Sequence, residues 1–143
     1  ADTTAAGGAK LASANAGVAA VDTALASPTR YVEFAFDAPA GTRYHLWVRL
    51  RALDNSTLND SLFAQFSDAL GTGGTPIYTV GTTNGLTLNL ATSGNGKMNG
   101  WGWVDGAYWL SQQPIVSFSR SGLHTLRLLV REDGVQLDQV VLS

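Results

Sequence analysis

Short runs in which apolar and polar residues alternate make up most of this chain, and glycine, proline, asparagine, aspartate and serine separate them. No segment keeps apolar residues at the roughly 3.6-residue spacing of an amphipathic helix over several turns. Alternation with a period of two is typical of strands that bury one face. The sequence therefore predicts an all-β chain.

The clearest alternating runs are the strands that we expect. They are Tyr31–Asp37, Tyr44–Ala52, Leu62–Phe66, Pro76–Val80, Leu86–Leu90, Ile115–Phe118, Leu123–Arg131 and Val135–Leu142. Residues 1–26 are rich in alanine but interrupted by glycine, which predicts loop with one or two weak strands. This pattern favours a single domain over residues 1–143, folded as a two-sheet antiparallel β-sandwich of the jelly-roll kind.

The two faces of the strand Tyr44–Ala52 differ in character, because side chains two residues apart share a face. The apolar face, which we expect in the core, carries Tyr44, Leu46, Val48 and Leu50, and the other carries His45, Trp47, Arg49 and Arg51. The second face is either a solvated sheet surface or the floor of a binding groove. Arg127 and Arg131 alternate with apolar residues in the same way, so the four arginines crowd one surface if the two strands share a sheet.

Aromatic residues gather between Trp101 and Trp109, a glycine-punctuated segment that resembles a loop and holds three of the four tryptophans and a tyrosine. Trp and Tyr rings stack on a sugar or on another ring while their polar group hydrogen-bonds at the edge. Alternatively, the rings close one end of a sandwich, since tryptophan is largely buried in most proteins. We expect one or two rings to remain accessible.

The composition excludes several classes of function. A formal net charge of −2 and a pI of about 5.5 provide no basic surface for nucleic acid. The absence of cysteine excludes thiolate catalysis, disulfides and cysteine-bound zinc. No apolar run approaches the roughly 20 residues that cross a bilayer, so the sequence predicts a soluble chain.

Signatures of catalysis are missing. No serine lies in a Gly-x-Ser-x-Gly elbow, and the candidate carboxylates lie mostly on turns with no evident partner. These carboxylates are Asp54, Asp60, Asp105, Glu132, Asp133 and Asp138. His45 and His124 lie inside expected strands, where a structural histidine is more common than a base or a metal ligand. The sequence therefore predicts a protein that is not an enzyme.

Oxygen-bearing side chains of the kind that calcium prefers cluster in Asp54–Ser61 and Glu132–Gly134. The first stretch lacks both the central glycine and the closing glutamate of an EF-hand loop. A polar surface loop is the more common interpretation, and a calcium site is the alternative.

A series of motifs runs in order from Tyr31 to the C-terminus. They include the turn Pro39-Ala40-Gly41 before an arginine-bearing strand, the segment Asn59-Asp60-Ser61, the motif Trp101-Gly102-Trp103, and the turn Arg131-Glu132-Asp133-Gly134 before a Leu-Asp-Gln strand. This order resembles the galactose-binding-like β-sandwiches of carbohydrate-binding modules, of the family 6 and 35 kind found in bacterial extracellular proteins.

The resemblance implies a secreted, non-catalytic domain that binds carbohydrate or polysaccharide through aromatic residues in loops at one end. It implies sugar contacts by Trp101, Trp103, Tyr108 and Trp109, helped by Asn59, Asp60 or Ser61, with support from Arg131, Glu132 and Asp133. It also implies a structural calcium ion, for which Asp138 corresponds to the aspartate of the last strand.

The chain departs from this pattern at its start, because the relatives usually begin with a further strand upstream of the Gly-Gly turn. Lack of that strand would remove part of the calcium site and leave a sheet edge open for pairing with another chain. The alternative function is therefore a structural or adhesive sandwich. In that case the aromatic segment or the open edge contacts a second copy, a neighbouring module or another protein.

Overall fold

The computed structural model describes residues 1–143, and its regular structure consists of strands and two short 3₁₀ turns. The elements are the turn η1 (Ala6–Gly8), β1 (Leu11–Ala12), β2 (Tyr31–Ala38), β3 (Tyr44–Ala52), the turn η2 (Leu53–Asn55), β4 (Ser61–Phe66), β5 (Ala69–Leu70), β6 (Leu86–Asn89), β7 (Gly102–Val104), β8 (Ile115–Phe118), β9 (Gly122–Val130) and β10 (Val135–Leu142). The expected loop with weak strands at the N-terminus is confirmed, since β1 is two residues long.

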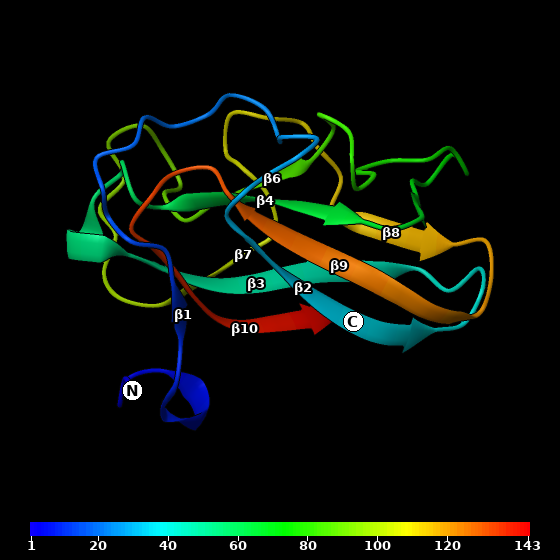
Figure 1. Ribbon diagram of the computed structural model, residues 1–143, viewed down its shortest axis with the longest axis horizontal. Coiled ribbons are helices and arrows are strands. Elements are labelled where there is room, and N and C mark those ends of the chain that lie inside the picture. The colour runs from blue at the N-terminus through cyan, green and yellow to red at the C-terminus, as the bar shows by residue number, and fades with distance from the viewer.

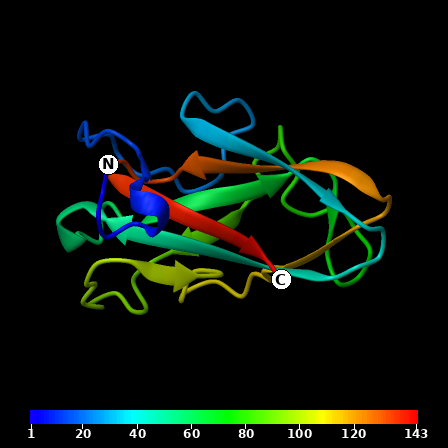
Figure 2. The same ribbon diagram turned by 90° about the horizontal axis from the view of Figure 1, so that it is seen from below.

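The strands form two antiparallel sheets, with the connecting loops at the ends of the strands (Figures 1 and 2). Sheet A has the order β1-β10-β3-β8-β5, with β7 also paired to β3, and sheet B has the order β2-β9-β4-β6. The predicted all-β, two-sheet antiparallel β-sandwich is thereby confirmed.

The core lies between the sheets, and β3 shows why alternation predicts it. Leu46, Val48 and Leu50 are completely buried, whereas the side chains between them are only half-buried. The three buried residues belong to a core cluster of 18 buried residues that includes side chains from both sheets. Removing this apolar surface from water is the main force that holds the two sheets together.

The arginines of β3 and β9 do not share a surface, because β3 lies in sheet A and β9 in sheet B. Each arginine is paired with its own carboxylate instead. The pairs are Arg49 with Asp138, Arg51 with Asp2, Arg127 with Glu33, and Arg131 with Glu132.

Two segments differ from the expected strands. The segment Pro76–Val80 makes only isolated bridges, because Tyr78 has a φ of 49°, which no extended strand can accommodate. Residues 102–104 form β7 rather than loop. Gly102 faces Leu90, and a Cβ at this position would lie 2.6 Å from Leu90 Cδ1, so the glycine permits a close approach of two segments.

The outer edge of β10 is only partly covered. Leu11 and Ala12 of β1 pair with Leu137 and Gln136, and no strand pairs with the outer edge of residues 139–142. A mostly apolar hollow of about 360 Å³ lies between the sheets beside β1. Half of this strand therefore has an unpaired outer edge.

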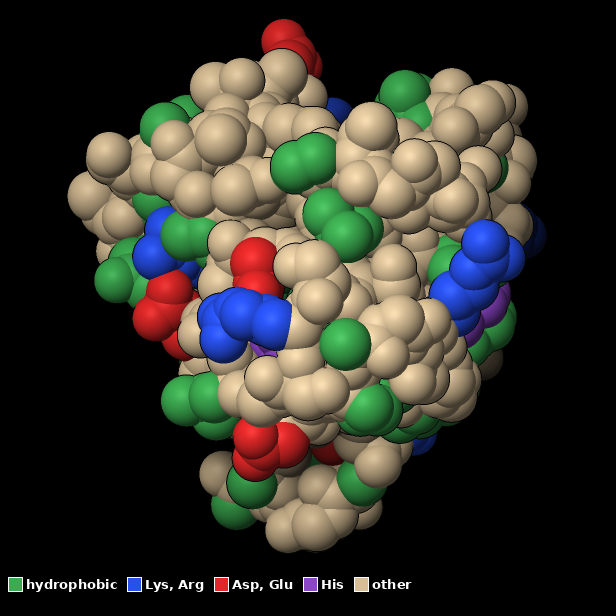
Figure 3. All heavy atoms as spheres, turned by 90° about the vertical axis from the view of Figure 1, so that its right-hand side faces the viewer, with side chains coloured by type: hydrophobic (Ala, Val, Ile, Leu, Met, Phe, Trp, Pro, Cys, Tyr) green, Lys and Arg blue, Asp and Glu red, His purple; other side chains and the backbone are tan.

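Figure 3 shows the end of the sandwich that holds the β2–β3 and β8–β9 turns. Its hydrophobic side chains form small, separate patches between acidic and basic ones. Near these turns, the buried imidazole of His124 stacks on Phe118 and contacts Asp68 at 2.7 Å, which also pairs with Arg120. This histidine packs between aromatic rings and lines none of the hollows described below.

Candidate functional site

Cross-strand pairing brings two acidic residues together at the opposite end of sheet B. Leu62 of β4 pairs with Val130 of β9, and the Glu132 N–H donates to the Ser61 carbonyl at 3.3 Å. The next positions along the same ladder are Asp60 and Glu132. The Asp60 N–H donates to Glu132 Oε2 at 3.1 Å, and the charge of Glu132 also acts on the Asp60 carboxyl group. These two acidic residues, 72 positions apart in the sequence, are therefore neighbours.

Arg131 compensates part of this negative charge. Its Nη1 donates to Glu132 Oε1 at 2.6 Å and to Ser61 Oγ at 2.9 Å. Ser61 is fully buried, so its hydroxyl fixes the guanidinium rather than facing solvent. Charge-assisted hydrogen bonds of this kind are short and directional, and they hold Arg131 and Glu132 in one arrangement.

Asp60 is the most unusual group of the site, since only 1% of its surface is exposed. Its Oδ2 accepts hydrogen bonds from the Ala91 N–H at 3.1 Å and from Asn89 Nδ2 at 3.3 Å, whereas its buried Oδ1 has no donor. Burial, together with the hydrogen bond and the negative charge of Glu132, raises the pKa of Asp60 to about 7. A proton on Asp60 relieves the contact between the two carboxyl groups.

Two aromatic rings stand beside these polar groups. Tyr108 and Trp109 are 51% and 45% exposed, and their rings meet edge to face at 4.7 Å between centroids. The Trp109 ring also lies 5.6 Å from the Arg131 guanidinium, a cation–π distance. The guanidinium and the neighbouring tyrosine therefore orient an indole that remains open to solvent.

The polar groups and the rings line one hollow of about 260 Å³. Its lining residues are Thr57, Asp60, Asn89, Ala91, Ser93, Gly94, Tyr108, Trp109, Arg131 and Glu132. Gly94 permits a close approach, because a Cβ there would lie 3.3 Å from the Tyr108 hydroxyl. We call this hollow the Trp109 hollow. It combines aromatic surface for stacking with acceptors and donors for hydroxyl groups.

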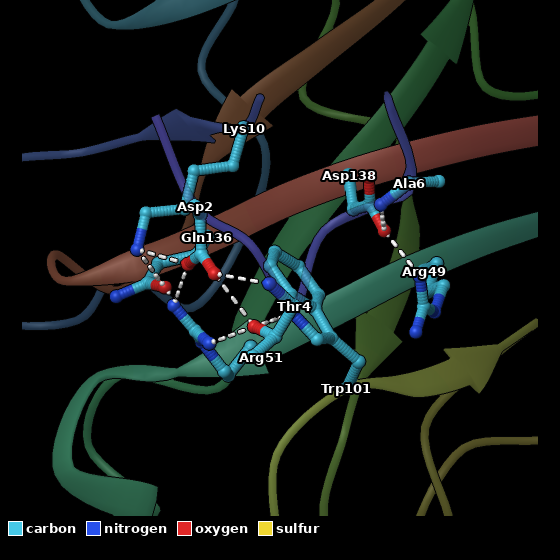
Figure 4. Close-up of polar contacts among 9 residues, drawn as sticks. All are labelled: Asp2, Thr4, Ala6, Lys10, Arg49, Arg51, Trp101, Gln136 and Asp138. Atoms are coloured by element: carbon cyan, nitrogen blue, oxygen red, sulfur yellow. Dashed lines mark hydrogen bonds and ion pairs between the residues drawn. The ribbon is translucent and has the colours of Figure 1, made fainter. Parts of the chain in front are cut away.

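Trp101 lies apart from this hollow, on the outer face of sheet A (Figure 4). The guanidinium of Arg51 lies 4.7 Å from its ring centroid, and its indole N–H donates to Thr4 Oγ1 at 3.0 Å. The N-terminal segment 2–10 thus supplies the partner of the indole N–H. The structure therefore places Trp101 outside the Trp109 hollow, on the face of sheet A where Trp103 of β7 is its neighbour.

The N-terminal segment is held in this place by several polar contacts (Figure 4). Asp2 pairs with Arg51 and with Lys10, and the Ala6 N–H donates to Asp138 Oδ2 at 3.1 Å. Hydrogen bonds, above all from Thr4, hold the pKa of Asp2 well below its ordinary value.

Asn59 and Asp133 also lie outside the Trp109 hollow. The Asn59 amide lies 2.8 Å from the carbonyl oxygens of both Leu58 and Asp133, and so ties the loop before β4 to the β9–β10 turn. The Asp133 carboxylate accepts the N–H groups of Ala16 and Val18, which lower its pKa. These two predicted residues support the loops around the site and do not line it.

The resemblance to carbohydrate-binding modules implies Asp138 as a calcium ligand. Its carboxylate is buried against Arg49, with Oδ2 engaged and Oδ1 without a partner. The structure brings no group of three or more histidine, cysteine or acidic side chains together. Calcium takes about six to eight oxygen ligands, and Asp138 offers one oxygen without a partner. A calcium ion at Asp138 stays a prediction.

Sequence reasoning did not assign Thr57, in the loop before β4, to the binding site. It also missed four further residues of the hollow, Asn89, Ala91, Ser93 and Gly94, and the pairing of Asp60 with Glu132. No local pattern marks them, because they lie in a strand end and a loop that are ordinary in composition. Only the β4–β6 pairing, with Ser61 opposite Asn89, brings them to the site.

Comparison of the chain with protein-family models and with curated protein sequences gives no match in either case. None of its helices is both long enough and apolar enough to span a membrane. The case for a function therefore rests on the geometry of the hollow.

Proposed function

We propose that this domain binds carbohydrate without transforming it, at the Trp109 hollow. The observation that carries the proposal is the placement of two half-exposed rings, Tyr108 and Trp109, beside an arginine and two carboxyl groups. Sugars present C–H faces that stack on indole rings and hydroxyl groups that pair with carboxylates and guanidinium groups. The predicted contacts Tyr108, Trp109 and Asp60 line the hollow, Ser61 positions Arg131, and Trp103 borders a neighbouring hollow.

The proposal includes an extracellular location and places this chain among modules that hold a polysaccharide near another activity. A shallow site of this size binds weakly by itself, and neighbouring copies or modules then raise the overall affinity. The resemblance of the motif order to carbohydrate-binding modules supports both statements.

The test is a screen of the purified domain against immobilised polysaccharides and oligosaccharides, with and without a calcium chelator, followed by calorimetry. Trp109→Ala should reduce binding about tenfold or more, while Trp109→Phe should retain part of it. Tyr31→Ala is a matched control, because Tyr31 is equally exposed and also lies against an arginine, Arg127, but on β2. Equal binding by the Trp109→Ala and Tyr31→Ala variants contradicts the proposal.

A second candidate function, assembly through sheet edges, rests on the open edge of residues 139–142 in β10. Edge strands pair readily with strands of other chains. Sedimentation velocity over a range of protein concentrations tests it. Association that depends on concentration, together with the absence of binding to every glycan, favours assembly over carbohydrate binding.

A further inference from the structure

A second hollow adjoins the Trp109 hollow. It has a volume of about 340 Å³, and its boundary includes Trp103, Leu110 and Gln112. Asn89, Ala91 and Tyr108 line both hollows. We call this one the Trp103 hollow. The two hollows are therefore continuous along the surface, with Tyr108 at their junction.

The volumes of the two hollows indicate the size of ligand that they can hold. The Trp109 hollow alone, at about 260 Å³, is smaller than the roughly 300 to 1,000 Å³ of typical small-molecule sites. The two hollows together fall within that range. The Trp109 hollow and the Trp103 hollow together therefore have room for a larger ligand than the Trp109 hollow alone.

Each hollow is bordered by exposed apolar side chains besides the shared Tyr108. Trp109 borders one hollow, and Trp103 and Leu110, which are 46% and 42% exposed, border the other. The Trp103 ring is not covered by the N-terminal segment that caps Trp101. Exposed apolar side chains that border both hollows suit a ligand with repeated units.

The wall at the junction is held firmly by hydrogen bonds. The Asn89 N–H donates to the Gly106 carbonyl at 3.0 Å, and its Nδ2 donates to the Ala91 carbonyl at 3.0 Å. Both ends of the Gln112 side-chain amide are hydrogen-bonded. The oxygen accepts from the Thr87 N–H at 2.9 Å, and the nitrogen donates to the Gly85 carbonyl at 2.9 Å. These contacts hold the surface under both hollows in one shape before any ligand binds.

We infer that the ligand lies across Tyr108 and occupies both hollows, so that the site binds a stretch of an oligosaccharide chain rather than a single sugar. The inference rests on the proposed carbohydrate binding. It goes further by stating that the bound ligand is longer than one sugar unit. Trp109 holds one part of the chain, and Trp103 with Leu110 holds the part beyond the tyrosine.

The test measures affinity against ligand length. The probes are glucose, xylose, mannose and galactose with their oligosaccharides up to the hexasaccharide, titrated by calorimetry. For the sugar series that binds, we expect the trisaccharide to bind about tenfold or more tightly than the monosaccharide, because a second ring adds a stacking contact. Equal affinity for the monosaccharide and the trisaccharide overturns the inference.

Variants of the Trp103 hollow separate this inference from the proposed function. Leu110→Ala should remove most of the gain with length while leaving the monosaccharide affinity unchanged, and Trp103→Ala should also reduce the gain. Trp109→Ala should weaken binding at every length. Leu58→Ala is the matched control, since Leu58 is exposed and borders neither hollow. An unchanged gain in the Leu110→Ala and Trp103→Ala variants overturns the inference alone. Failure of every probe to bind overturns the proposed function and the inference with it.

Discussion

At the scale of single residues, Asp60 is the residue whose surroundings are most unusual, because it places a buried carboxyl group at the start of β4. Its carboxyl group is buried beside Glu132 and receives hydrogen bonds on only one oxygen. Two adjacent carboxylates repel each other, and burial strengthens the repulsion because water no longer screens it. The same arrangement leaves the hollow acidic overall, with Arg131 as its only basic side chain.

This arrangement predicts a specific pH dependence of folding. Because the folded pKa of Asp60 is about 7, above the ordinary value of 3.8, its contribution to stability is fully present below pH 3.8 and is lost as the pH rises through about 7. Asp60→Asn mimics the protonated form and should unfold at a higher temperature than the wild type at pH 8, with little difference at pH 4. Thermal unfolding from pH 4 to pH 8 measures this.

The control for this prediction is Asp22→Asn, which removes an exposed carboxylate and should follow the wild-type profile. The explanation is wrong if the Asp60→Asn and wild-type unfolding temperatures change in parallel across this range.

At the scale of elements, the N-terminal segment 2–10 decides which tryptophans are accessible. It crosses the outer face of sheet A, where Arg51 contacts Asp2, Thr4 and Gln136 (Figure 4). The same segment supplies the hydrogen-bond acceptor of the Trp101 indole. Trp101 and Trp103 belong to neighbouring positions of the same sheet, yet only Trp103 is strongly exposed.

Removing the central contact should loosen this segment. Arg51→Ala deletes the guanidinium that holds Asp2 and Thr4, so we expect amide hydrogen exchange at Thr4 and Ala6 to accelerate about tenfold or more. Arg43→Ala is a suitable control, because Arg43 is exposed and forms no ion pair. Exchange detected by NMR measures the effect. Identical rates in both variants would show that the segment is held by other contacts.

At the scale of the whole molecule, the two sheets are joined by a group of aromatic rings at the end opposite the hollows. Phe118 of sheet A lies 5.6 Å from Phe36 and 6.1 Å from Phe66 of sheet B, between ring centroids. All three rings pack in or against the main core cluster. Loss of one of these rings therefore weakens the packing of sheet A against sheet B.

Phe118→Ala should lower the free energy of unfolding by about 3 to 5 kcal/mol, because it leaves a cavity between the sheets. Leu123→Ala, at an exposed position of β9, should change it by about 0.5 kcal/mol or less. Urea unfolding followed by tryptophan fluorescence and circular dichroism measures both. A loss for Phe118→Ala as small as for Leu123→Ala would contradict this account of the core.

Local residue patterns are enough to predict the features that depend only on neighbouring residues. Alternation placed most of the strands and separated the buried side of β3 from its half-buried side, because side-chain direction in a strand repeats every two residues. The segment Pro76–Val80 failed as a strand because its local pattern does not reveal the positive φ of Tyr78. The glycines around Trp101 and Trp103 predict a loop, although the alternation of the two tryptophans around an inward glycine fits β7.

The way in which these segments combine into a site depends on the tertiary structure. Asp60 meets Glu132 because β4 pairs with β9 in one register, and Asn89 joins them because β6 pairs with β4. Trp101 is capped because a distant segment folds over it, while Tyr108 and Trp109 stay open beside Arg131. These contacts join residues far apart in the sequence, and their energies depend on register and packing, which no local period encodes.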